Sequence, residues 1–238
     1  MREIIEQGSI KSNTDLKEYK YQIRFVDKAY LQDVIELEQF VLDKLLDKDL
    51  FAPAPNGSYE EILNGRGILM GVFINDRLIG MSSVYYPDDD DDNIGKDVGL
   101  KNEEIYKVVY LCNAVIHPDF RGQGLINKLF SYLLDEVKNE GKWRYIIATA
   151  SPRNYASIKN ILSAGLKIIM VKVKFANYIR FIFYNDLENP ISINQSSKIE
   201  VLNWDVEKQK ELLEKGYVGF SQNKTEEGIK IIFGKLND

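Results

Sequence analysis

The segment with the clearest chemical potential is a short glycine turn between an apolar run and an amphipathic helix. Gly122 and Gly124 are separated by one residue, and the apolar run before them ends at Ile116. Glycine accepts backbone angles that a β-carbon forbids, and it lets a ligand approach the main chain closely. The first amides of a helix have no intrahelical partner, and together with the helix dipole they favour an anion. The pattern therefore predicts a phosphate or pyrophosphate site on the amides of residues 123–127.

The neighbouring residues narrow the type of anion site. Arg121 and Lys128 flank the turn and add positive charge locally. The sequence contains no Gly-x-x-x-x-Gly-Lys-Ser/Thr motif, which excludes a P-loop. A dinucleotide fingerprint needs a third glycine where this chain has Asn127, so that site is excluded as well. For two glycines taken alone, a tight turn without a ligand is the alternative.

The single histidine and the single cysteine leave little scope for metal or nucleophilic chemistry. His117 is the only side chain with an ordinary pKa near neutrality, but it precedes Pro118 in the turn, and we expect a structural or solvated role. Cys112 lies in the apolar run and is expected to be a small core residue rather than an acyl carrier. One cysteine excludes an internal disulfide and a multi-cysteine zinc site, and we predict no metal.

Hydrophobic periodicity predicts the elements that position the turn. The run Val108–Ile116 reads as a strand covered on both faces, and the helix after the turn is expected to end near Gly141. Alternation and turn residues predict further strands, and a 3.6-residue period predicts further helices. The other expected strands are 21–26, 67–74, 77–86, 143–150, 166–175 and 178–184, and the other expected helices are 27–45, 58–65 and 154–164.

The chain divides into three predicted parts. Residues 1–20 are polar without a sustained period and are expected to be a loose N-terminal lead-in. Residues 21–190 form the main domain, and residues 191–238 form an extension whose aromatic residues predict packing on that domain. The docking surface is expected to be the strand 178–184, although a dimer contact is an open alternative. The acidic run Asp88–Asp92 is expected to be a solvated loop, with attraction of a cationic acceptor as the alternative.

Composition sets the broad class. The chain has 238 residues, of which 45% are hydrophobic and 28% charged, so a sizeable core is expected and wholesale disorder is not. A net charge of -5 gives no general attraction to nucleic acid or anionic lipid. No apolar run is long enough to span a membrane or to serve as a secretory signal, so we predict a cytoplasmic protein with no membrane partner.

The residues around the turn resemble the GNAT superfamily of acyl-coenzyme A dependent N-acetyltransferases. The family turn Val-x-Pro-x-x-Arg-Gly-x-Gly is similar to Ile116-His-Pro-Asp-Phe-Arg-Gly-Gln-Gly124. The shorter family signature Gln/Arg-x-x-Gly-x-Gly/Ala maps to Arg121, Gly124 and Ile126, where isoleucine replaces a small residue. A second family motif, an asparagine, a helix and then Gly-Phe, is similar to Asn154 through Gly165-Leu166. The resemblance covers roughly residues 21–188.

The resemblance implies a fold and a cofactor. The fold is α/β (α+β), with a mixed, mostly antiparallel central sheet splayed between two parallel strands and helices on both faces. The small C-terminal α/β extension lies outside the resemblance. Acetyl-coenzyme A is the implied co-substrate, with its pantetheine arm along the strand that ends at Ile116. The implied cofactor-binding residues are Val115, Ile116, Arg121, Gly122, Gln123, Gly124, Leu125, Ile126, Asn127 and Asn154.

The implied reaction is transfer of an acetyl group to an amine, of a small molecule or a protein, by direct attack in a ternary complex. A non-catalytic module that binds acyl-coenzyme A as a sensor is the alternative. A backbone amide near Val115 is the implied oxyanion donor, but the tyrosine that often serves the family as general acid is replaced by Ile161. The catalytic acid and base are therefore unassigned. Tyr85, Tyr86 and Asn113 are the residues expected to line the acceptor site, and alternation places only one of the two tyrosines there.

Overall fold

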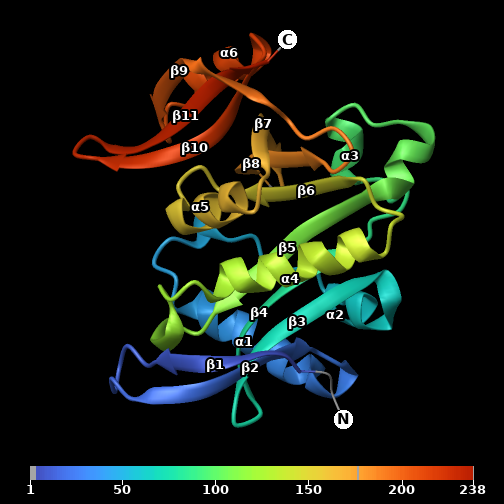
Figure 1. The fold of residues 1–238 in the computed structure, drawn as a ribbon, viewed down its shortest axis with the longest axis vertical. Coiled ribbons are helices and arrows are strands. Elements are labelled where there is room, and N and C mark those ends of the chain that lie inside the picture. The colour runs from blue at the N-terminus through green and yellow to red at the C-terminus, as the bar shows by residue number, and fades with distance from the viewer. Residues whose placement is uncertain (1–3, 176, 238) are drawn as a thin grey trace. The chain divides into compact units, whose positions relative to one another are not determined.

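The computed structural model describes residues 4–175 and 177–237, and these divide into two compact units (Figure 1). The first unit comprises the described residues up to Lys48 together with Pro53–Pro87 and Tyr110–Lys142. The second unit comprises Asp49–Ala52, Asp88–Val109 and the described residues from Trp143 onward. The glycine turn lies in the first unit.

The first unit is built on a sheet in which every strand pairs antiparallel with its neighbours, in the order β1-β2-β3-β4-β5. Its strands are β1 (Ile4–Lys11), β2 (Glu18–Phe25), β3 (Gly67–Ile74), β4 (Arg77–Tyr85) and β5 (Val108–Ile116), and its helices are α1 (Leu31–Asp43), α2 (Ser58–Glu61) and α4 (Leu125–Asn139). The predicted α/β class is confirmed.

Helices cover both faces of this sheet. In Figure 1, α4 lies in front of the strands and α1 lies behind them. The apolar side of α4 is fully buried, with Leu129, Leu133 and Val137 at 0% exposure. This period-3.6 stripe is why α4 was predicted from the sequence. Its burial holds α4 against the sheet, so that the helix begins at Leu125, shortly after the end of β5.

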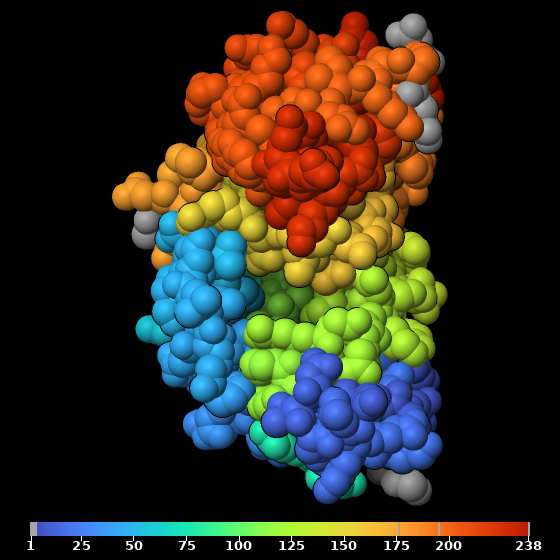
Figure 2. All heavy atoms as spheres, turned by 90° about the vertical axis from the view of Figure 1, so that its left-hand side faces the viewer, coloured from blue at the N-terminus to red at the C-terminus, as the bar shows by residue number. Residues whose placement is uncertain are grey.

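The N-terminal segment differs from the prediction of a loose lead-in over residues 1–20. It contains β1 and the start of β2, which form a hairpin that lies beside α4 (Figure 2). Glu6 of β1 accepts hydrogen bonds from the hydroxyls of Tyr21 and Tyr132 and pairs with Lys128 of α4. Among the residues of β1, only Ile10 is a buried apolar side chain, so the strand has no apolar alternation for sequence analysis to detect.

The strands of the second unit pair antiparallel in the order β6-β8-β7-β10-β11-β9. Its strands are β6 (Tyr145–Ala150), β7 (Lys167–Lys174), β8 (Tyr178–Asp186), β9 (Ile193–Leu202), β10 (Tyr217–Thr225) and β11 (Gly228–Leu236), and its helices are α3 (Ile94–Asp97), α5 (Tyr155–Ser163) and α6 (Val206–Glu214). The acidic run Asp88–Asp92 lies outside every helix and strand.

The C-terminal extension joins this sheet through β10, which pairs with β7 at Gly219 and Ile168. The prediction that the extension docks on the strand 178–184 was wrong. That strand belongs to β8, whose two edges are already paired with β6 and β7. Phe233 of the extension is fully buried, whereas Trp204 is 57% exposed. The extension therefore completes a sheet edge as well as contributing apolar packing.

Truncation after Pro190 is expected to lower the melting temperature, because it removes the neighbour of β7 and the buried side chains of Ile231 and Phe233. Burial of one such side chain contributes about 1.5–3 kcal/mol. Differential scanning calorimetry of the full and truncated chains measures the effect. An unchanged melting temperature would show that the extension is an independent attachment.

Candidate active site

The strand that leads to the glycine turn contains a β-bulge. Cys112 lies opposite Ser83 and Val115 lies opposite Met81, so two residues of β5 face the single residue between Ser83 and Met81. Asn113, one of the two, has φ of +53°, a left-handed conformation that asparagine tolerates better than most residues. A bulge interrupts the ladder and leaves a residue unpaired. Residues 112–114 are half-buried, whereas both ends of β5 are buried.

The turn after β5 has the geometry of an anion site. Gly122 and Gly124 have φ of +82° and +80°, and a β-carbon added at either would meet no atom within 4 Å. The glycines are therefore required by the backbone angles, and the space in front of them is open. Within the described residues, no protein acceptor bonds the amides of residues 123–127, which begin the 15-residue helix α4. These unpaired amides and the helix dipole form a cradle for a phosphate group.

The two basic residues beside the turn are not equivalent. Arg121 donates from Nε to the carbonyl oxygen of Ile116 at 3.0 Å, and its Nη atoms bond no acceptor in the described part of the chain. Burial lowers the pKa of Arg121, but a guanidinium stays charged in proteins. Lys128 pairs with Glu6 and bonds the hydroxyl of Tyr21. The expectation that Lys128 supplies local positive charge is therefore wrong, and Arg121 is the cation at the turn.

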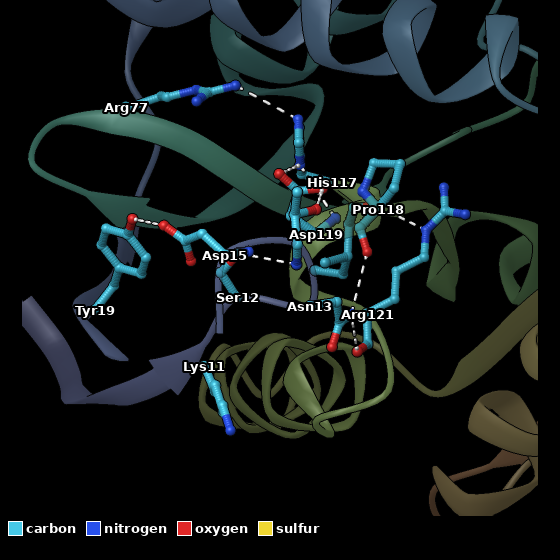
Figure 3. Close-up of polar contacts among 12 residues, drawn as sticks. Lys11, Ser12, Asn13, Asp15, Tyr19, Arg77, His117, Pro118, Asp119 and Arg121 are labelled. Atoms are coloured by element: carbon cyan, nitrogen blue, oxygen red, sulfur yellow. Dashed lines mark hydrogen bonds and ion pairs between the residues drawn. The ribbon is translucent and has the colours of Figure 1, made fainter. Parts of the chain in front are cut away.

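The N-terminal hairpin holds the turn from one side (Figure 3). The side-chain amide of Asn13 donates to the carbonyl oxygens of Pro118 and Arg121, and the backbone amide of Asn13 donates to Asp119. The side chain of Gln123 bonds both the amide and the carbonyl of Lys11, at 3.1 and 2.7 Å. The side chain of Gln123 is thus used for this contact, which leaves its backbone amide for a ligand.

His117 is packed into the protein rather than presented to a substrate. Its ring stacks on Phe40 at 4.8 Å between centroids, and only 8% of the residue is exposed. Nδ1 accepts a hydrogen bond from the amide of Asp119, and a guanidinium nitrogen of Arg77 lies 3.4 Å from Nε2. Burial, and to a smaller extent the charges of Arg77 and Arg121, lower the pKa of His117. The ring is therefore neutral at pH 7 and has a packing role.

The two tyrosines expected at the acceptor site point to opposite faces. The hydroxyl of Tyr85 donates to Glu61, the last residue of α2, and the ring of Tyr85 lies 6.2 Å from that of Tyr110. The hydroxyl of Tyr86 donates to Glu140 at the end of α4, and this residue is buried. Asn113 donates to the hydroxyl of Ser83, two residues before Tyr85. Tyr85 and Asn113 thus lie on connected positions of β4 and β5, and Tyr86 lies on the other face.

Asn154 belongs to the second unit, where it caps α5. Its Oδ1 accepts from the amide of Ser157 at 3.0 Å, and its Nδ2 donates to the carbonyl oxygen of Leu50 at 3.1 Å. The side chain therefore orders the first turn of α5, and its expected contact with a cofactor stays a prediction. Ile161, at the position of the family tyrosine, is buried.

A carboxylate that sequence analysis overlooked lies on α1. Glu38 is 8% exposed and accepts hydrogen bonds on Oε1 from the hydroxyl of Tyr59 at 2.8 Å and the amide of Ala54 at 3.3 Å. Burial raises the pKa of Glu38. The signal was present in the sequence, because Glu38 occupies the apolar stripe of α1 between Val34 and Val41, where a glutamate is out of place.

Two features are absent from residues 4–175 and 177–237. No helix there is both long and apolar enough to cross a membrane. The same residues contain no cluster of three or more histidine, cysteine, aspartate or glutamate side chains suited to a metal ion.

Comparison with known proteins places this geometry in a family context. The model of the acetyltransferase (GNAT) family matches residues 33–165, which include β5, the glycine turn and α4. No curated protein matches the sequence.

Several solved structures share the fold at low identity. A protein of Salmonella typhimurium solved with its cofactor acetyl-CoA is 19% identical, with a TM-score of 0.54 over 74% of this chain and 98% of that one. An aminoglycoside acetyltransferase in complex with coenzyme A and kanamycin is 15% identical, with a TM-score of 0.54 over 71% and 95% of the two chains. A ribosomal-protein-alanine N-acetyltransferase of Brucella melitensis is 18% identical, with a TM-score of 0.51 over 69% and 99%.

The pKa of His117 predicts a pH-dependent contribution to stability. Because burial holds the pKa of His117 in the folded protein below its ordinary value of 6.5, the unfolded chain binds the proton more readily. The contribution of His117 is therefore complete above pH 6.5 and is lost as the pH falls through 6.5 toward the folded pKa. Between about pH 7.5 and about pH 5.5, wild type is expected to lose more melting temperature than His117→Gln. Equal losses of melting temperature in wild type and His117→Gln would contradict the burial of a neutral His117 ring.

Proposed function

Because the chain belongs to the GNAT acetyltransferase family, we propose that it transfers the acetyl group of acetyl-coenzyme A to an amine by direct attack in a ternary complex. The observation that carries the proposal is the glycine turn at the start of α4. It combines two left-handed glycines, open space in front of both, and a run of amides without protein acceptors.

The residues of the first unit fit the phosphate end of this co-substrate. The amides of residues 123–127 would hold the pyrophosphate, and the free Nη atoms of Arg121 would add a charge-assisted contact. The backbone of Val115 and Ile116 would bond the pantetheine arm. Ile126, half-buried at the start of α4, replaces the small residue of the family signature but leaves its own amide available.

The bulge on β5 supports the placement of the reacting carbonyl. An unpaired backbone group at Asn113 or Ala114, next to Val115, can donate to the oxygen of the thioester as negative charge develops there. The thiolate of coenzyme A then leaves as the new C–N bond forms. A preorganised donor of this kind is worth about 2.7–4 kcal/mol in the barrier of comparable acyl transfers.

The acceptor is proposed as an amine, of a small molecule or of a protein. An alkyl ammonium has a pKa of about 10.4, and only the neutral amine attacks a thioester, so the site needs a group that removes a proton. The structural neighbours include acetyltransferases of an aminoglycoside and of a ribosomal-protein alanine, which supports an amine without selecting one.

Coenzyme A and acetyl-coenzyme A are expected to raise the melting temperature, whereas NAD is not. A ligand at a hundred times its dissociation constant adds about 2.7 kcal/mol to the free energy of unfolding. Gly124→Val is expected to abolish this effect, because a branched side chain would fill the space in front of the amides. Thermal shift and calorimetric titration measure both.

Gly141→Val is the matched control for that variant. Gly141 follows α4, has φ of +64° and also has open space around its missing β-carbon, so the backbone strain is comparable but the site is at the other end of the helix. Coenzyme A binding should survive in Gly141→Val. If millimolar coenzyme A neither raises the melting temperature of the wild type nor binds it, the proposal is refuted. If coenzyme A binds but no thiol is released over an amine library, the sensor function is favoured.

The hairpin contact predicts a second effect on cofactor binding. Asn13→Ala removes the side-chain bonds to Pro118 and Arg121, so the turn loses part of its preorganisation, and the dissociation constant for coenzyme A is expected to rise about tenfold. Lys17→Ala, in the same hairpin turn and exposed like Asn13, is the control and should bind as wild type does. Equal affinities in Asn13→Ala and Lys17→Ala would show that the hairpin does not order the site.

A further inference from the structure

We propose that Glu38 binds the ammonium group of the acceptor and removes its proton, which makes an amine that arrives in its cationic form the acceptor class of this enzyme. The inference rests on the proposed acetyl transfer and deepens it, because it assigns the base that the sequence left open. It is carried by the isolation of Glu38, by its position beside the bulge of β5, and by the orientation of its two oxygens.

Glu38 is a buried carboxylate without a protein cation. Within the described residues, no lysine, arginine or histidine forms an ion pair with it, and Oε2 accepts no hydrogen bond. Both of its bonds, from Tyr59 and Ala54, reach Oε1. Glu6, by contrast, is half-buried in the same unit and pairs with Lys128. One oxygen of Glu38 is thus held by the protein, and the other is free for a ligand.

This arrangement is unfavourable for folding alone. A buried charge destabilises the fold unless it is paired, and an apolar residue at this position of α1 would complete the stripe formed by Val34, Leu37 and Val41. A buried carboxylate that lacks a counter-ion in the protein is instead suited to a cation supplied by a ligand. For an amine acceptor, that cation is its ammonium group.

The position of Glu38 relates it to the reacting strand. Tyr59 of α2, which bonds Glu38, is buried on the face of the sheet covered by α1, and α1 packs on β4 (Figure 1). The charge of Glu38 reaches the thiol of Cys112 on β5, whose pKa it raises together with burial. Cys112 contacts Ser83, and Ser83 accepts from Asn113 at the bulge. The charge of Glu38 therefore acts on Cys112, the residue directly before Asn113 in the chain.

The titratable groups around Glu38 are less suited than Glu38 to accept the proton of the acceptor. Tyr59 and Cys112 face it from α2 and β5, and burial raises the pKa of both, that of Cys112 to about 11. His117, the other titratable group against α1, is held by its stacking on Phe40. Burial raises the pKa of Glu38 itself, which makes its carboxylate a stronger base. The carboxylate nevertheless remains a weaker base than a free alkyl amine in water.

The proposed step moves two protons and one acetyl group. The ammonium transfers one proton to Oε2 of Glu38, and the neutral amine adds to the thioester carbon to form a C–N bond. The tetrahedral intermediate collapses with cleavage of the C–S bond, and the second proton of the nitrogen reaches the thiolate, which gives the amide and coenzyme A. Glu38 then returns its proton to water. Tyr59 acts as a positioning residue that fixes Oε1 so that Oε2 points toward the acceptor.

Steady-state kinetics of Glu38→Gln test the assignment. Wild type is first assayed for thiol release with ethylamine, a polyamine and an aminoglycoside, and the amine with the highest turnover is used throughout. Glu38→Gln keeps the acceptor atom for Tyr59, so its melting temperature should not fall. At about pH 7, its kcat/KM for the amine is expected to fall by about a hundredfold or more, with KM for acetyl-coenzyme A unchanged.

Glu36→Gln is the matched control, because Glu36 is an exposed glutamate on the same helix, bonded only by Gln32 among the described residues. It should retain wild-type kinetics. Glu38→Asp keeps a carboxylate with a shorter reach and should recover part of the lost rate. This variant also tests the proposal if the glutamine variant fails to fold.

The pH profile separates catalysis from packing. With Glu38 as the base, kcat/KM of wild type and Glu38→Asp is level from the pKa of the carboxylate up to that of the amine. Glu38→Gln depends on amine that is already neutral, so its kcat/KM should rise about tenfold per pH unit toward about pH 10.4. Wild-type kcat/KM and a level profile in Glu38→Gln would overturn the assignment of Glu38 alone. A wild type that binds acetyl-coenzyme A but acetylates no amine would overturn the proposed function, and the role of Glu38 with it.

Discussion

The site depends on one backbone constraint, which is the abrupt passage from β5 into α4. The chain makes this passage with two left-handed residues two positions apart, and both are glycine because φ near +80° is strained for any other residue. The burial of Leu129, Leu133 and Val137 fixes the axis of α4, so the passage directs the first amides of the helix into open space. A phosphate group bound there would replace the water that otherwise satisfies those amides.

The charged side chains around this passage differ in whether the protein itself pairs them. Lys128 is neutralised by Glu6 and thereby ties the N-terminal hairpin to α4, while Arg121 keeps its Nη atoms free. On the opposite face of the sheet, Glu38 pairs with no cation of the part of the chain that the structure describes. The first unit thus holds a positive group where an anionic co-substrate would enter and a negative group where a cationic acceptor would enter, despite a net charge of -5.

The sequence predicted the parts of this unit that rely on apolar periodicity and on glycine. β5, the glycine turn and α4 were predicted because a continuous apolar run, two glycines and a 3.6-residue stripe are strong local signals. The β1 strand escaped prediction because Ile10 is its only buried apolar residue, and Glu6 is held by hydroxyls and an amine from distant segments. Glu38 escaped for a related reason, since a lone acidic residue was counted as polar although its neighbours on the stripe were apolar. The docking of the extension on β7 instead of β8 depended on strand order, which local patterns do not encode.

A crystal structure of the protein with acetyl-coenzyme A tests the central claim, that the passage from β5 to α4 is a pyrophosphate site, most directly. The account predicts pyrophosphate oxygens within hydrogen-bond distance of the amides of residues 123–127, a guanidinium of Arg121 turned toward them, and the hairpin contacts of Asn13 and Gln123 unchanged. A pyrophosphate bound elsewhere, with those amides facing only water, would contradict it.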